Sequence, residues 1–178
     1  GLHDPSEPYW NDADLRRYAY WSVFAGGCGF TYGHNAIMQF HRQSDTDAAY
    51  GVREVWQDAL SAPGASQMIF LKKLLLSKPY FERVPAQELI YGPAGERYDY
   101  LAATRGRDYA FVYTFTGRNI SISTDKLQWK GFKASWFKPA DGSEIPAGSY
   151  KTGAVESFDP PGPQANGNDW VLILDKEE

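Results

Sequence analysis

The chain has 178 residues, a formal net charge of −4 and no block of basic residues, so the electrostatic footprint of a nucleic-acid-binding protein is absent. Its composition, 43% hydrophobic and 22% charged, is globular and excludes a disordered tail. No apolar run reaches the ~20 residues of a membrane span, and no signal peptide or metal-ligand spacing is visible. We therefore expect no nucleic-acid partner, no membrane span, no metal and no other cofactor.

The first predicted helix covers residues 15–25, "LRRYAYWSVFA", because its apolar residues recur at i, i+3, i+4, i+7 and i+8 and so share one face. Asp12 or Asp14 can cap the amino end of this helix. The glycine pair at 26–27 is typical of a helix carboxyl end. Cys28 follows between glycines, and we interpret it as a small buried hydrophobic residue rather than a nucleophile.

Short apolar and polar stretches follow. "CGFTY", residues 28–32, predicts a buried strand, and "NAIMQFHR", residues 35–42, predicts one or two helical turns. A second helix is predicted at 52–60 and is expected to be ended by Pro63-Gly64. "ASQMIFLKKLLLS", residues 65–77, predicts a third helix with one apolar face and two lysines on its wet side.

From residue 78 onward the hydrophobic period becomes two. Residues 97–115 predict two strands joined by a turn at 105–108, and aromatic residues alternate with smaller ones in the second strand. Four further strand-like runs, separated by turn signals, are 119–123, 132–139, 153–159 and 169–175. The sequence therefore predicts an α+β chain with a mostly helical part at 1–77 and an antiparallel β-sandwich at 78–178.

The helical part is too small to bury a sufficient core alone. Either its helices pack on the sandwich, or it belongs to a larger body upstream. The order helix, strand, loop, helix, then an all-β module is how a (β/α)₈ barrel would end before an accessory domain. Barrel strands deliver their last residues to the active-site rim, so Tyr32, His34, Asn35 and Gln39 would face a ligand there.

Several motifs resemble one family, the apiosidase-like glycoside hydrolases. They are "DLRRYAYWSVFAGGCGFTYGHNAIMQF", "WQDALSAPGASQM", "LAATRGRDYAFVYTFTGRN" and the terminal "FDPPG…NDWVLILD". The resemblance covers nearly the whole chain. It implies the C-terminal part of a TIM-barrel catalytic domain followed by a β-sandwich of the kind labelled collagen-binding. It also implies a secreted or periplasmic bacterial enzyme, often of Bacteroides-type bacteria, that acts on plant polysaccharide side chains.

The same resemblance implies that both catalytic carboxylates lie upstream of this chain. Glu7 in "SEPYW" echoes a Glu-Pro-x-Tyr-Glu-like motif, but no apolar strand precedes it, and we interpret it as a loop residue. We interpret Glu54 and Asp58 as residues on the ordinary solvated face of a helix. We interpret Asp169 as the residue that caps the "NGND" turn. We therefore assign no catalytic residue and expect the polypeptide alone to be inactive, since glycoside hydrolysis needs two carboxylates.

Two functional hypotheses stay open. In the first, the chain is part of a glycoside hydrolase, with the four rim residues hydrogen-bonding sugar hydroxyls or positioning a carboxylate, and with a sandwich that braces the barrel. In the second, the chain is a non-catalytic module that binds carbohydrate or protein through its sandwich. Under either hypothesis, a single histidine such as His34, considered without its neighbours, more often has a structural role than a ligand-binding one. The expected partners are carbohydrate and the missing N-terminal barrel portion, or a second copy if apolar surface stays exposed.

Overall fold

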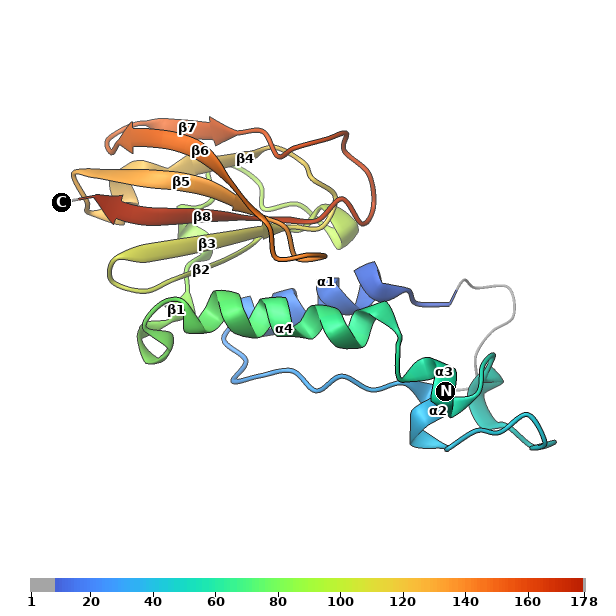
Figure 1. Ribbon diagram of the computed structural model, residues 1–178. Coiled ribbons are helices and arrows are strands. Elements are labelled where there is room, and N and C mark those ends of the chain that lie inside the picture. The colour runs from blue at the N-terminus through green and yellow to red at the C-terminus, as the bar shows by residue number, and fades with distance from the viewer. Residues whose placement is uncertain (1–8, 178) are drawn as a thin grey trace.

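The computed structural model describes residues 9–177, in which two long helices lie against one face of a β-sandwich (Figure 1). The helices are α1 (Asp12–Phe24), α2 (Asn35–Met38), α3 (Trp56–Ala59) and α4 (Pro63–Leu76). The strands are β1 (Val84–Pro85), β2 (Ala102–Arg105), β3 (Tyr109–Thr114), β4 (Ile120–Ser123), β5 (Gly131–Phe137), β6 (Glu144–Lys151), β7 (Val155–Phe158) and β8 (Trp170–Glu177). This α+β arrangement with a β-sandwich confirms the predicted fold class at that level.

Helix α1 begins where the sequence supplies a complete capping box. The side chain of Asn11 accepts a hydrogen bond from the backbone N–H of Asp14, and the Asp14 carboxylate accepts one from the N–H of Asn11. The cap is therefore Asn11 rather than the predicted Asp12 or Asp14, although Asp14 completes the capping box. Gly26, with a φ of 106°, follows the carboxyl end as predicted.

Helix α4 begins at Pro63, where the sequence analysis placed a helix break. Proline fits the first turn of a helix because the N–H that it lacks would have no partner there. Gly64 sits one residue later, where a side chain would meet Leu15 and Tyr32. Pro63 and Gly64 therefore begin α4, the third predicted helix, instead of ending the second predicted helix. That second helix is α3, which is shorter than the predicted range of 52–60.

Six strands form the main sheet in the order β1-β2-β3-β8-β5-β6, and every neighbouring pair is antiparallel. β4 and β7 form the second, two-stranded sheet. Between the two sheets lies a core built largely of aliphatic and tryptophan side chains, among them Leu101, Val112, Ile122, Trp136, Trp170 and Leu172. Both tryptophans, which lie in β5 and β8, thus pack the core between the sheets.

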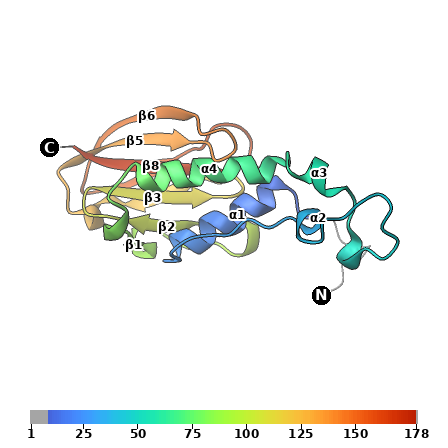
Figure 2. The same cartoon turned by 60° about the horizontal axis from the view of Figure 1, so that its bottom comes forward.

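A second core lies on the opposite face of the six-stranded sheet, under α1 and α4, which run side by side across it (Figure 2). Every residue of β3 is buried, because its two faces serve the two cores. Tyr20 stacks on Tyr113 with 4.9 Å between ring centroids, and Phe24 stacks on Phe111 at 6.0 Å. The helical part therefore packs directly on the sandwich, which was one of the two alternatives left open.

A buried ion pair also joins α1 to the sandwich. Asp169, 2% exposed, accepts hydrogen bonds from Arg16 Nε at 2.9 Å and Nη2 at 2.8 Å, and from the Tyr113 hydroxyl at 3.2 Å. Burial raises the pKa of Asp169, although the bonds from Arg16 lower it. Asp12 and Gln67 accept two further bonds from Arg16, each at 2.6 Å. The interpretation of Asp169 as a turn cap was wrong, since it links the helices to the sheet.

Three further expectations need correction. Residues 28–32 form no strand, because a β-strand requires a hydrogen-bonded neighbour and none of the described strands pairs with them. Cys28 is exposed rather than buried. β6 was missed because Pro146 and Gly148 interrupt its pattern, although an edge strand with a bulge tolerates both.

The chain between α1 and α4 leaves the sandwich altogether. An extended stretch crosses beneath the two long helices, and residues 34–62, with α2 and α3, then form a distal lobe beyond the end of the sheet (Figure 1). The four predicted rim residues lie in or just before this lobe. Among residues 9–177, no helix has the length and apolar character that crossing a membrane would require.

Candidate functional site

His34 occupies the amino end of α2 and holds two partners at once. Its Nδ1 accepts a hydrogen bond from the N–H of Ala36 at 3.2 Å, which makes it the helix cap. Its Nε2 lies 3.0 Å from Oε1 of Glu54. Because Nδ1 accepts, the ring carries its proton on Nε2 and donates it to the carboxylate. The imidazole is therefore fixed in one tautomer and one orientation.

Tyr32 lies next to the same carboxylate. Burial, followed by the charge of Glu54, raises the pKa of its hydroxyl above the ordinary value. The hydroxyl oxygen is closed from solvent and has no hydrogen-bond partner among the described residues. The tyrosine ring contacts the start of α4, where a side chain at Gly64 would come within 3.2 Å of it. His34 thus contacts Glu54 directly, Tyr32 lies within range of the same charge, and the absence of a side chain at Gly64 leaves room for the tyrosine ring.

Asn35 and Gln39 are brought together by a different set of bonds. Gln39 donates from Nε2 to the carbonyl of Ala49 and accepts at Oε1 from the N–H of Ala49, both at 2.9 Å. It also donates to Oδ1 of Asn35, whose own amide donates to Ala49 at 3.3 Å and to Tyr50 at 3.4 Å. The two amides therefore hold the turn at 49–51, in which Tyr50 has a φ of 59°.

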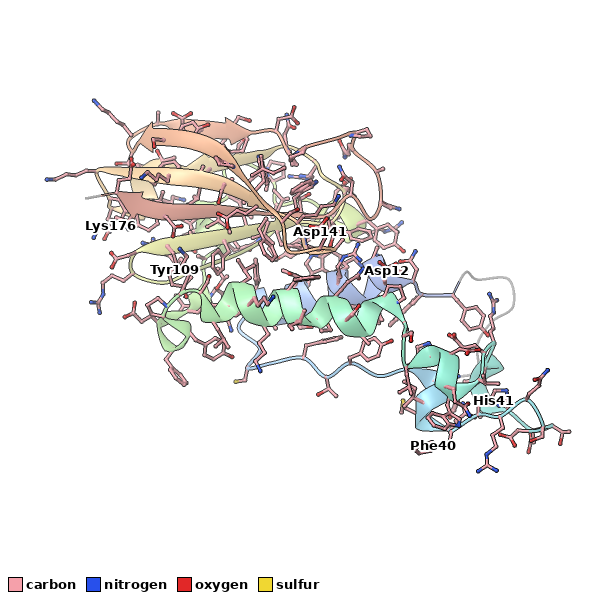
Figure 3. The ribbon with its side chains drawn as sticks, viewed as in Figure 1. Asp12, Phe40, His41, Tyr109, Asp141 and Lys176 are labelled. Carbon is pink, nitrogen blue, oxygen red and sulfur yellow. The ribbon has the colours of Figure 1, made fainter. Side chains whose placement is uncertain are left out.

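Aromatic side chains surround this polar cluster. The Tyr9 hydroxyl donates to the carbonyl of Gly51, and the Arg53 guanidinium lies 3.4 Å from the centre of the Tyr9 ring. Phe40 packs edge-on against Trp56 at 5.8 Å. Figure 3 shows Phe40 and His41 in the distal lobe, away from the sandwich. The lobe is therefore tied to the segment that precedes α1.

Glu54 is the functional candidate that the sequence analysis missed. It was interpreted as part of a solvated helix face, but it precedes α3 and faces His34 instead. No local pattern marks it, because its contact depends on the course of the loop between α2 and α3. Glu7, which the sequence analysis also considered, lies outside the described residues. Within residues 9–177, no group of three or more His, Cys, Asp or Glu side chains could hold a metal ion.

A carboxylate beside a histidine and a partly exposed tyrosine can hydrogen-bond sugar hydroxyls or hold a reacting group in place. Hydrolysis of a glycosidic bond needs a second carboxylate on the other side of the bond. The cluster of Tyr32, His34 and Glu54 is therefore suited to one side of a carbohydrate site.

Comparisons with known proteins cover almost the whole chain. Residues 1–82 match the family model "Apiosidase-like, catalytic domain", and residues 84–175 match "Putative collagen-binding domain of a collagenase". A search of curated proteins gave no match.

Two solved structures are similar to the chain at 47% identity and a TM-score of 0.93 each. One is described as "Glycoside hydrolase" and the other as a glycoside hydrolase family 5 from Bacteroides vulgatus ATCC 8482. Each match covers 99% of this chain, which spans 39% of the length of each of those structures. The second model matches more than half of the chain, so the chain belongs to the family with a C-terminal domain of this collagen-binding type, and its first 82 residues are similar to the apiosidase-like catalytic domain.

Proposed function

We propose that the chain is the C-terminal part of a glycoside hydrolase that removes side chains from plant-type polysaccharides. The observation that carries the proposal is the 47% identity over 99% of this chain to glycoside hydrolases of which it spans 39%. In this proposal α1, the extended stretch after it and α2 to α4 close a (β/α)₈ barrel, and the upstream portion supplies both catalytic carboxylates. The enzyme is secreted or periplasmic.

An open apolar surface supports this arrangement. On the side of α1 and α4 away from the sheet lies a shallow hollow of about 280 Å³. Apolar side chains line most of it, including Val23, Phe30, Met68, Leu71 and Leu75. Leu76 at its margin is exposed. Packing of the remaining barrel against this surface would bury it, whereas the isolated chain would tend to self-associate through it.

We assign the four rim residues two kinds of role. Tyr32 and His34, which both lie within range of the Glu54 charge, contact the sugar or position a catalytic carboxylate. Asn35 and Gln39 shape the substrate rim by holding the turn at 49–51, since their amides are bonded to its backbone. The β-sandwich braces the barrel through the aromatic contacts and the buried ion pair beneath α1.

Kinetics of the complete enzyme, upstream portion included, test this assignment. His34→Ala should lower kcat/KM on an aryl glycoside or a plant oligosaccharide by about tenfold or more, the value of one positioned hydrogen bond to a charged partner. His41→Ala is the matched control, because His41 lies in the same lobe outside the cluster. The 178-residue chain alone should release no sugar. Equal kinetics for the two variants would refute the role of His34, and hydrolysis by the chain alone would refute the upstream location of the carboxylates.

A further inference from the structure

A cleft lies at the junction between the apiosidase-like part and the sandwich, separate from the cluster around Glu54. It has a volume of about 440 Å³ and is lined by the segment that leads into α1, including Trp10 and Asn11, and by sandwich loops that carry Tyr98 and Asn166. A second hollow of about 480 Å³ adjoins it and shares Tyr98 and Arg17. Each volume lies in the range of small-molecule sites.

Two aromatic rings are presented at this junction. One face of Trp10 stacks on Tyr18 at 4.6 Å between centroids, and the residue is 65% exposed, so its other face is open to solvent. Tyr98 is 47% exposed and is supported by Arg17, whose guanidinium lies 4.3 Å from the ring centre. Flat, open rings held in place from behind are the surfaces on which pyranose faces stack.

The turn that carries Tyr98 is built with backbone strain. Arg97 has a φ of 50°, a left-handed conformation that is unusual for a residue with a side chain. Gly95, with a φ of 89°, precedes it, and a side chain there would lie 2.3 Å from the carbonyl oxygen of Asp99. Such strain persists only where the surrounding structure enforces it, and it concentrates at binding sites.

Buried donors without acceptors lie beneath the two rings. Arg17 is 2% exposed and forms an ion pair with Asp14 at 3.0 Å, yet its Nε has no hydrogen-bond partner among the described residues. The indole N–H of Trp21, which lines the second hollow, has none either. A buried donor left unpaired costs stability and so calls for an explanation. The Arg17 guanidinium instead faces the rings of Tyr18 at 4.7 Å, Trp21 at 5.4 Å and Phe115 at 4.8 Å, so it holds the aromatic side chains of the junction in place from behind.

We propose that this junction cleft is a second carbohydrate subsite, in which a glycan chain stacks on Trp10 and Tyr98 and places hydroxyl groups near Asn11 and Asn166, two exposed polar residues of its lining. The proposal takes its ligand class from the proposed function. The sandwich then contributes to substrate binding as well as bracing the barrel. Tyr9, which lines the cleft and bonds to Gly51 of the distal lobe, links the subsite to the rim.

Calorimetric titration of the full chain tests the subsite without any catalytic step. The probes are cellohexaose, xylohexaose, arabinohexaose and a galacturonic acid hexamer. For the probe that binds best, Trp10→Ala and Tyr98→Ala should each raise Kd by about tenfold, as expected for the loss of one stacked ring. Trp10→Phe, which keeps a ring, should stay within about threefold of the unmodified chain. Tyr91→Ala removes another exposed tyrosine of the sandwich and should leave Kd unchanged.

Thermal melting curves of each variant separate loss of binding from loss of fold, and Trp10→Phe provides a second variant that keeps the packing on Tyr18. Binding of none of the four probes would overturn the proposal, as would Trp10→Ala and Tyr98→Ala variants that bind like Tyr91→Ala. Because this readout is binding and the test of His34 is turnover, the subsite and the proposed function can fail independently.

Discussion

Replacing Asp169 by Asn removes the negative charge that faces Arg16 beneath α1 while keeping the shape of the side chain. Removing one partner of a buried ion pair typically costs about 3–5 kcal/mol, because the other charge remains buried and uncompensated. Asp12 and Gln67 still accept bonds from Arg16 at 2.6 Å, so we expect the lower end, about 3 kcal/mol. With an m-value of about 2 kcal/mol per M, the urea midpoint should fall by about 1.5 M.

Equilibrium urea unfolding at pH 7, followed by tryptophan fluorescence and circular dichroism, measures this loss. The matched double variant combines Asp169→Leu with Arg16→Leu, and it should recover most of the stability because both buried charges are gone and Asp12, which loses Arg16, is partly exposed and keeps its bond from Gln67. The two single leucine variants complete the cycle, and the coupling free energy should be about 2 kcal/mol or more. An Asp169→Asn variant within about 0.5 kcal/mol of the unmodified chain, or a cycle without coupling, would refute the reasoning.

Three further predictions concern the same core and the junction turn. Tyr20→Phe should leave the free energy of unfolding unchanged or raise it by about 1 kcal/mol, because the buried Tyr20 hydroxyl has no partner among the described residues. Tyr113→Phe should lower the free energy of unfolding by about 1 kcal/mol, because it loses the hydrogen bond to Asp169. Urea unfolding that ranks the two variants in the opposite order would contradict this. Asp12→Asn should destabilise the chain at pH 7 and progressively less as the pH falls below 3.8. Burial raises the pKa of Asp12, but the hydrogen bonds from Gln67 and Arg16 outweigh this effect, so the pKa in the folded chain is lower than the ordinary value. The Asp12 carboxylate therefore stabilises the fold above its ordinary pKa, and this stabilisation is lost as the pH falls through the folded-state pKa; a difference in unfolding free energy that stays constant from pH 2.5 to 7 would disprove this. Gly95→Ala should cost about 2 kcal/mol or more, given its φ of 89° and the carbonyl of Asp99 at 2.3 Å, and a melting temperature equal to that of the unmodified chain would count against this.

Hydrophobic periodicity predicted the helices and strands whose opposite faces lie in different surroundings. In β3, tyrosine and phenylalanine alternate with alanine and valine because one face packs on the helices and the other lies between the sheets. α1 and α4 were recognised for the same reason. Periodicity failed at the edge strand β6, which is mostly exposed and therefore carries little alternation.

Only those residues of the candidate site that are close to one another in the sequence could be predicted to lie together. The closeness of His34, Asn35 and Gln39 follows from one short helix, and the structure places all three at α2. Glu54 comes from beyond a loop whose path no local pattern encodes. Asp169 looked like a turn residue because its partner Arg16 lies 153 positions away in the sequence.

The position of β8 has a consequence for synthesis. The last strand of the chain lies between β3 and β5, so the ribosome must release residues 170–177 before the six-stranded sheet can close. Until then, the face of the sheet on which α1 and α4 pack is incomplete, because Val171 and Ile173 of β8 belong to that core. A chain that lacks residues 170–177 should therefore lose the six-stranded sheet as a whole rather than one edge of it.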